Sequence, residues 1–173
     1  PKSGPAGLQD KSVQFIAANL RNSGILGVAE GVVEAGEAIG WDVTIADAVG
    51  SNDKIGELLT EALANKPDAL IIGGFDAGAH LELLETLSVQ GTDIVGWHAG
   101  PFPGPIADTP VFCNVTTDPL AVASVAAEHA IAHAHEHSRV GVVIFTDDRY
   151  EIALAKSDEM ARVVEACEHC DVL

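Results

Sequence analysis

Five runs of nearly unbroken apolar sequence recur along the chain, and they limit its fold more than any other feature. The runs lie at residues 13–18, 43–46, 69–72, 94–97 and 140–145. Strands that are apolar throughout are buried on both faces, as in parallel sheets covered by helices. The first four runs are separated by stretches with apolar residues at helical spacing, residues 25–39, 55–62 and 81–87. This alternation predicts an α/β fold, a doubly wound parallel sheet with right-handed crossovers.

The regular alternation stops at residues 101–110, where four prolines exclude a helix. Beyond it we expect a short strand at residues 111–115 and a long helix from about Pro119 to His137. The strand at residues 140–145 and a last helix carrying Ile152 to Val164 should follow. Another strand should begin near Asp171, so we expect the chain to be part of a longer protein.

Composition excludes several classes of protein. The 173 residues include 47% hydrophobic residues, enough for a folded core, and carry a net charge of −17. Such an acidic surface repels phosphate backbones and anionic lipids, and the basic residues are scattered, so we expect no nucleic-acid partner and no direct membrane insertion. No apolar run approaches the roughly 18 residues of a membrane span. The N-terminus lacks the apolar core of a signal peptide, which could already have been removed.

The three cysteines leave two interpretations open. Cys113 stands alone, whereas Cys167 and Cys170 form a C-x-x-C pair. A zinc ribbon needs a second pair, and a thioredoxin-like motif would open a helix rather than follow one. The pair is therefore either a structural disulfide or two free thiols.

Ligands of doubly wound sheets bind beyond the carboxyl ends of the strands, so these segments hold the candidate site. After the first strand come Asn19, Arg21 and Asn22, whose amides and guanidinium could donate hydrogen bonds to a polar ligand. Asn22 or Ser23 could equally cap the following helix. Neither G-x-G-x-x-G nor a P-loop motif occurs, so a nucleotide cofactor is not expected. The segment 47–53, after the second strand, is interpreted as a turn with an Asn or Asp helix cap.

Aromatic and polar residues meet at two further strand ends. Phe75 and Asp76 follow the third strand, where Asp76 could alternatively cap a helix, and Trp97 and His98 end the fourth. Aromatic rings beside carboxylates and amides suit a polyhydroxylated ligand, whose C–H faces stack on rings while its hydroxyls pair with polar groups.

The motifs together resemble type I periplasmic sugar-binding proteins of ABC transporters, similar to ribose-binding proteins. The resemblance covers nearly the whole chain from Lys11. It rests on the order and spacing of several segments, residues 11–22, 27–31, 40–43, 66–72, 114–118 and 144–150.

The resemblance implies two similar lobes joined by a hinge, with the ligand between them. Carried over, residues 11–112 form the first lobe, residues 113–118 a hinge crossing that includes Asn114 and Asp118, and residues 119–173 the start of a second, incomplete lobe. The terminal cysteine pair is similar to a close pair in some members, which implies a disulfide between Cys167 and Cys170 and an oxidising compartment.

The sequence also departs from the ribose-binding pattern. Relatives often carry Asp-Arg after the fourth strand, where this chain has Trp97 and His98. In the second lobe the resemblance implies a ligand contact from Arg149, Tyr150 or Lys156. The identity of the ligand is therefore open.

A histidine stripe in the long helix is the remaining candidate for a metal site. His129, His133 and His137 follow one another at intervals of four residues, so they share one helix face. The H-E-x-x-H signature is absent and acidic neighbours indicate a solvated surface, so we expect no metal or other cofactor.

These features predict a solute-binding protein of an ABC importer, not an enzyme, since no nucleophile–base arrangement stands out. It would capture a monosaccharide or polyol between its lobes and deliver it to the permease, in the periplasm or outside the cell. The alternative is the effector-sensing domain of a lactose-repressor-like transcription regulator, which shares the fold but needs a helix-turn-helix ahead of Lys11.

Overall fold

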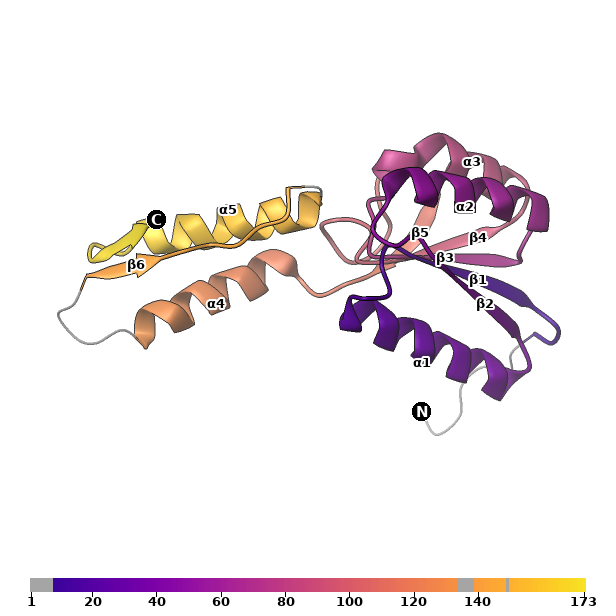
Figure 1. Ribbon diagram of the computed structural model, residues 1–173, viewed down its shortest axis with the longest axis horizontal. Helices are drawn as coiled ribbons and strands as arrows, with labels where there is room; N and C mark the ends of the chain where they lie inside the picture. The colour runs from indigo at the N-terminus through magenta and orange to yellow at the C-terminus, as the bar shows by residue number, and fades with distance from the viewer. Residues whose placement is uncertain (1–7, 134–138, 149) are drawn as a thin grey trace. The chain divides into compact units, whose positions relative to one another are not determined.

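A computed structural model describes residues 8–133, 139–148 and 150–173. Five of its strands form one parallel sheet in the order β2-β1-β3-β4-β5 (Figure 1). The strands are β1 (Ser12–Ala17), β2 (Asp42–Asp47), β3 (Ala69–Gly73), β4 (Asp93–Trp97) and β5 (Val111–Val115). The helices between them are α1 (Ser23–Ile39), α2 (Asn52–Asn65) and α3 (Leu81–Val89), the last preceded by a 3-10 turn, η1 (Gly78–His80). The predicted doubly wound α/β sheet is confirmed.

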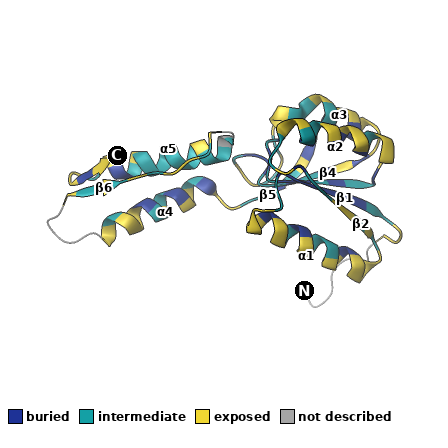
Figure 2. Ribbon diagram, viewed as in Figure 1, coloured by how far each residue is buried: buried dark blue, intermediate teal, exposed yellow. Residues whose placement is uncertain are grey.

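Helices cover both faces of this sheet. Helix α1 lies on one face, and α2 and α3 lie on the other (Figure 1). The approach of α1 to β2 depends on Gly36, because a Cβ there would lie 2.3 Å from the Cγ2 of Val43. Residues of the sheet and of these helices form one buried hydrophobic cluster, and Figure 2 colours parts of the strands and helices as buried. The largest side chains of this cluster include Phe15, Ile16, Leu59, Leu70, Ile72 and Leu84.

Burial differs between the central strands and the edge. Every residue of β1 after Ser12 is buried, as its apolar sequence predicts. Among the described strands, β2 has β1 as its one neighbour, and Ile45 on β2 is 39% exposed. An edge strand has a strand neighbour on one side, so its residues are less buried than its apolar sequence predicts.

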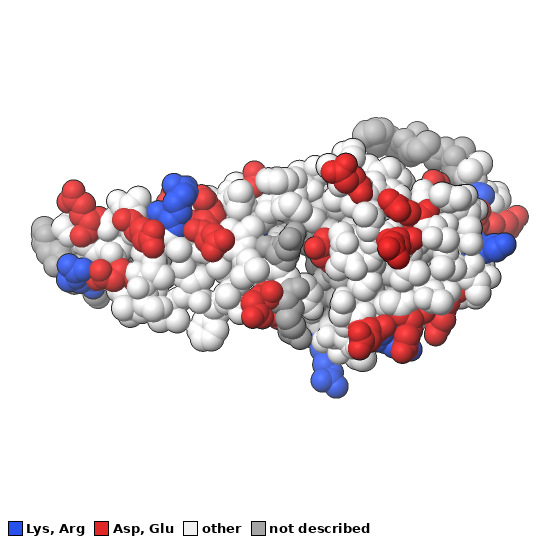
Figure 3. All heavy atoms as spheres, turned by 90° about the horizontal axis from the view of Figure 1, so that it is seen from above, with Lys and Arg blue, Asp and Glu red and all other residues white. Residues whose placement is uncertain are grey.

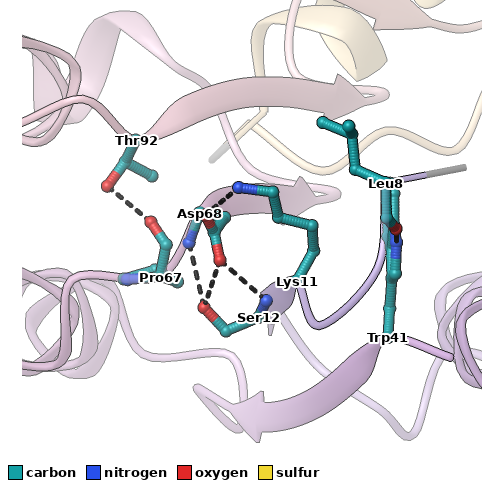
Figure 4. Close-up of polar contacts among 7 residues, drawn as sticks. All are labelled: Leu8, Lys11, Ser12, Trp41, Pro67, Asp68 and Thr92. Carbon is teal, nitrogen blue, oxygen red and sulfur yellow. Dashed lines mark hydrogen bonds and ion pairs between the residues drawn. The ribbon is translucent and has the colours of Figure 1, made fainter.

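Polar contacts fix the amino end of β1 against the α2–β3 connection (Figure 4). The Asp68 carboxylate accepts hydrogen bonds from Lys11 Nζ at 2.7 Å, Ser12 N at 2.9 Å and Ser12 Oγ at 3.0 Å. These donors lower the pKa of Asp68 to about 2, the Lys11 hydrogen bond contributing most. Nearby, the Thr92 hydroxyl donates to the carbonyl of Pro67.

The second part of the chain contains α4 (Pro119–Ala132), β6 (Val140–Val142), α5 (Glu151–Glu165) and β7 (Cys170–Val172). Strands β6 and β7 pair in parallel, and the strand expected near Asp171 is confirmed as β7. The Ser124 hydroxyl on α4 donates a hydrogen bond to the Glu159 carboxylate on α5. The Arg162 guanidinium donates two hydrogen bonds to the same carboxylate. The buried side chains of these elements are small or medium in size: Pro119, Ala123, Ala127, Val164 and Cys170.

Two predicted boundaries are wrong. The strand expected at residues 140–145 ends at Val142, and Val143 and Phe145 are 61% and 93% exposed. Strand β6 has β7 as its one partner among the described residues, and that pairing spans three residues. The helix expected to reach His137 ends at Ala132, with His133 as its C-cap, in a stretch without the glycine or proline that would mark an end. His137 itself lies outside the described residues.

The chain divides into two compact units. The first unit contains the residues up to Ala99 together with Gly104–Val115, and the second contains Gly100–Pro103 and Thr116–Leu173. Strand β5 belongs to the sheet, so residues 113–115 of the predicted hinge crossing are part of the first unit. Within the described ranges, no helix combines the length and apolar content needed to cross a membrane.

Candidate functional site

The carboxyl ends of the parallel strands define the candidate site of the first unit. Strand β1 has β2 on one side and β3 on the other, so the strand order reverses direction at β1. At such a switch point the connections after neighbouring strands diverge to opposite faces and leave a crevice. The segments that follow β1, β3 and β4 therefore contain the candidate ligand-binding residues of this unit.

Asparagine side chains shape the segment after β1. The Asn22 Oδ1 accepts hydrogen bonds from the backbone N–H groups of Gly24 at 2.9 Å and Ile25 at 3.3 Å, so Asn22 is the N-cap of α1. The Asn19 Oδ1 accepts from the Arg21 N–H at 3.0 Å. Each asparagine accepts hydrogen bonds from nearby backbone N–H groups through its Oδ1. Neither side-chain NH2 group donates to another described residue. Both amides are therefore possible donors to a ligand, and the exposed guanidinium of Arg21 is a third possible donor.

Asp47 supports this loop from the end of β2. Its Oδ1 accepts hydrogen bonds from the backbone N–H groups of Leu20 at 3.1 Å and Val49 at 2.9 Å. The segment 47–53 is a turn followed by a cap, since the Ser51 hydroxyl accepts from the Lys54 N–H at the start of α2. The predicted turn is confirmed, but the cap is Ser51 rather than the Asn or Asp expected from the sequence.

Trp97 lies over two glycines at the end of β4. A Cβ on Gly24 would lie 3.5 Å from its indole ring, and a Cβ on Gly74 would lie 3.8 Å from it. Gly74 also has a φ of +82°, which favours glycine, and a Cβ there would lie 2.7 Å from Ile25. The indole is half-buried and packs against the core on one side. The glycines thus leave room for the indole ring beside the start of α1.

His98 follows Trp97 in an uncommon backbone conformation. Its φ is +51°, and its backbone N–H donates to the carbonyl of Val115. The imidazole meets the indole of Trp97 edge to face, with ring centroids 4.4 Å apart. The two rings therefore lie together at the end of the strand, as the sequence predicts for that segment.

The residues after β3 divide between core and surface. Phe75 is 3% exposed and packs in the core, a position that leaves little of its ring to contact a ligand. Phe75 is therefore assigned to the core rather than to the proposed ligand-binding site. Asp76 is half-buried, and its Oδ1 accepts from the Gly78 N–H at 2.9 Å. The N-cap residues of η1 and α3 are Ala77 and His80, so Asp76 is not the helix cap that the alternative interpretation expects. The second carboxylate oxygen is a possible acceptor for a ligand hydroxyl.

His80 and Asn52 form a polar pair at this edge that sequence reasoning missed. The Nε2 of His80 lies 2.9 Å from the Oδ1 of Asn52, and the imidazole meets Phe75 edge to face. Burial lowers the pKa of His80, while the charge of Asp76 partly opposes that shift. Asn52 is the first residue of α2 and His80 the last of η1, so each follows a strand end. Their positions after β2 and β3 are the sequence feature from which the pair could have been predicted.

Asn114 and Asp118, the predicted hinge residues, have local structural roles. Asn114 is 1% exposed, and its Oδ1 accepts from the Ala99 N–H at 3.0 Å. Its backbone pairs with Gly104 in an isolated antiparallel bridge. Asp118 is the N-cap of α4 through Leu120 and Ala121 N–H groups. The hinge role of both residues stays a prediction.

The remaining candidates lie in the second unit or outside the described residues. Tyr150 precedes α5 as its N-cap residue, and its backbone N–H donates to the Asp147 carbonyl. Arg149 lies outside the described residues. Cys167 and Cys170 are joined by a disulfide, and Cys113 is free. Among the described residues, no group of three or more His, Cys, Asp or Glu side chains could hold a metal ion.

The charge of the surface matches the composition. Acidic side chains are spread over the face seen in Figure 3, and no broad basic patch interrupts them there. The candidate residues at the strand ends combine hydrogen-bond donors, carboxylates and an indole. This combination suits reversible binding of a small neutral molecule with several hydroxyl groups.

Comparison with known proteins places the chain among binding proteins. The family model described as a periplasmic binding protein domain matches residues 13–163. The fold is similar to an ABC sugar transporter subunit from Rhodobacter sphaeroides 2.4.1, with a TM-score of 0.80 at 16% identity, covering 96% of this chain and 56% of that one. It is also similar to an ABC transporter solute-binding protein from Agrobacterium vitis with bound allitol, with a TM-score of 0.78, 15% identity and coverage of 96% and 55%.

A transcription regulator shares the fold as well. The Cra transcriptional dual regulator from Pseudomonas putida, in complex with fructose 1-phosphate, aligns with a TM-score of 0.72 and 17% identity, covering 93% of this chain and 56% of that one. The chain thus spans little more than half the length of these solved structures. None of the curated proteins is significantly similar to it in sequence.

Proposed function

Because the chain belongs to the periplasmic binding protein domain family, we propose that it is a solute-binding protein of an ABC importer. It captures a monosaccharide or polyol without altering it chemically and delivers it to a membrane permease. Closure of two lobes buries the ligand, and tighter binding to the closed state shifts the population toward it. The neighbours with bound allitol and D-glucose support this class of ligand.

The single observation that carries the proposal is the half-buried indole of Trp97 among polar groups at the carboxyl edge. A sugar or polyol presents C–H faces to an aromatic ring and hydroxyls around its rim. The NH2 groups of Asn19 and Asn22 can donate to hydroxyl oxygens, and the outer oxygen of Asp76 can accept from a hydroxyl. Arg21 supplies a further donor.

The rest of the proposed site comes from the second lobe. Arg149 and Tyr150 contribute ligand contacts, and the crossing that contains Asn114 and Asp118 acts as the hinge. These roles come from the resemblance to the family, and they are part of the same proposal. The protein acts in the periplasm or outside the cell, and the disulfide between Cys167 and Cys170 fits an oxidising compartment.

A thermal-shift screen tests the proposal. Sugars, polyols, nucleosides and amino acids are added separately, each at a concentration far above a plausible dissociation constant. A ligand at about 100 times its Kd stabilises a protein by about 2.7 kcal/mol. We expect neutral sugars or polyols to raise the melting temperature. Stabilisation by amino acids or nucleosides alone would replace the proposed ligand class.

The effector-sensing domain of a lactose-repressor-like regulator remains the second candidate function, because the Cra regulator shares the fold. Sugar phosphates in the same screen distinguish the two. Arg21 is the one permanently cationic side chain among the described candidates of the first unit, and carboxylates lie at the same edge. A phosphate monoester is therefore poorly matched, and we expect free sugars to stabilise the protein more than their phosphates.

A further inference from the structure

Two histidines of the second unit lie ring against ring in the last turn of α4. The ring centroids of His129 and His133 are 3.9 Å apart, with the planes tilted by 38°. Both residues are exposed, and their spacing of four places them on one helix face. Neither belongs to the set of residues assigned to the sugar-binding site.

A hydrogen bond fixes which nitrogen of His133 is available. Its Nδ1 lies 3.0 Å from the backbone carbonyl oxygen of His129. A carbonyl oxygen only accepts hydrogen bonds, so Nδ1 carries the proton in the neutral ring. The Nε2 atom is then left with its lone pair directed away from the backbone. Metal-binding histidines in proteins have this arrangement, with one ring nitrogen donating to a carbonyl or carboxylate and the other bound to the metal.

The electrostatic surroundings also favour a cation. His129 lies in the last turn of α4 and His133 is its C-cap, where the final carbonyl groups carry partial negative charge. The whole chain has a net charge of −17, which raises the local concentration of cations. An exposed pair of imidazoles at this position therefore meets little electrostatic cost on binding a divalent ion.

We propose that His129 and His133 form a two-imidazole site for a divalent transition-metal ion. Imidazole nitrogens bind Cu²⁺, Ni²⁺ and Zn²⁺ rather than Mg²⁺ or Ca²⁺, and among these ions Cu²⁺ binds most tightly. Water molecules complete the coordination, so the ion exchanges readily. The site is independent of the proposed transport function, and the ligand-binding residues take no part in it.

Copper titration of the full chain, prepared without an affinity tag, tests the site. Calorimetry of the unaltered chain should detect Cu²⁺ binding, and the electron paramagnetic resonance spectrum should show hyperfine coupling to two imidazole nitrogens. His129→Ala and His133→Ala should each weaken binding by at least about tenfold, since even the loss of an outer-shell partner costs that much. His129→Ala keeps the backbone carbonyl that orients His133, so its effect reports the lost imidazole.

His169→Ala is the matched control, because His169 is an exposed histidine of the same unit outside this pair. It should leave Cu²⁺ affinity unchanged. Circular dichroism checks that each variant keeps its helix content, and alanine is a strong helix former at both positions. Copper binding that persists in the double variant, a spectrum without nitrogen coupling, or no binding by the unaltered chain would overturn the proposal.

Discussion

At the scale of single residues, one side chain can shape the backbone and still offer atoms to a ligand. Asn22 illustrates this, because its oxygen caps α1 while its NH2 group remains a possible donor. The residue type alone predicted both roles, and the structure confirms the cap. Asp76 is not a cap, yet it also divides its oxygens, since Oδ1 accepts from the Gly78 N–H and Oδ2 is a possible acceptor for a ligand. Capping and ligand binding therefore need not exclude one another at the strand ends.

Replacing the indole at the end of β4 tests the sugar-binding proposal directly. Trp97→Ala should weaken ligand binding by roughly 1 kcal/mol, about fivefold in Kd, because an aromatic face that stacks on the ligand is lost. Isothermal calorimetry with the sugar found by thermal shift measures the change. The chain has two tryptophans, so Trp41→Phe serves as the control and leaves Trp97 as the fluorescent reporter of binding. Equal affinity in a folded Trp97→Ala protein would assign the ring to the core.

Asn114 should be important for stability whatever its part in a hinge. Asn114→Ala removes the acceptor of the Ala99 N–H in a buried place, which leaves that donor unsatisfied. We expect a loss of about 1–3 kcal/mol in the free energy of unfolding, measured by urea titration. Asn65→Ala, at an exposed site at the end of α2, should change it by less than about 0.5 kcal/mol. Similar values for the two variants would contradict this account.

Phe75 shows where prediction from residue type ends. Its position after a strand suggested an exposed ring, yet Gly74 adopts a positive φ and the next side chain enters the core. Sequence does not specify the direction in which a chain leaves such a glycine. The pairing of His80 with Asn52 was missed for a related reason, since it joins residues 28 positions apart whose contact depends on how the strands are ordered.

At the scale of helices and strands, the apolar runs predicted the strands of the five-stranded sheet well and β6 poorly. Strands β1, β3 and β4 have strand neighbours on both sides, and their apolar runs match the observed strands within a residue at most ends. Strand β6 pairs with β7 over a short segment, so the strand is shorter than the apolar run that predicted it. A strand needs hydrogen-bonding neighbours as well as an apolar sequence, and an apolar run does not show which strands will pair with it.

The carboxylate that joins β1 to the start of β3 makes stability depend on pH. The pKa of Asp68 is lowered to about 2, below its ordinary value, so the ionised form stabilises the folded state above pH 4. That contribution is lost as the pH falls from about 4 to about 2. Asp68→Asn should therefore lower stability at neutral pH and flatten its decline across this range.

Urea midpoints at several pH values between 2 and 7 measure this effect. Asp42→Asn is the control, since Asp42 is exposed at the same end of the sheet and its carboxylate has no recorded hydrogen bond to the described residues. It should keep the acid-side decline of the unaltered protein. A decline in Asp68→Asn as steep as that of the unaltered protein would contradict the role assigned to Lys11 and Ser12.

At the scale of the whole molecule, the alternation of apolar runs with helical spacing was sufficient to predict the fold class. The family resemblance, drawn from the order of motifs, is confirmed by a family model that spans residues 13–163. The ligand could not be predicted in the same way, because folds of this kind bind many solutes through small changes at the strand ends. Trp97 and His98 are such a change from the ribose-binding pattern.

The two units should differ in their resistance to local unfolding. The core of the first unit contains large buried side chains from all its layers, whereas the hydrophobic cluster of the second has three buried members, Ala127, Val164 and Cys170, with partly buried neighbours. Burial of apolar surface supplies about 25 cal/mol per Å², so the smaller core provides less protection against opening. Hydrogen exchange followed by mass spectrometry should show slow exchange in β1, β3 and β4 and markedly faster exchange in α4 and α5. Equal protection in both units would mean that the second is stabilised by contacts beyond its own small core.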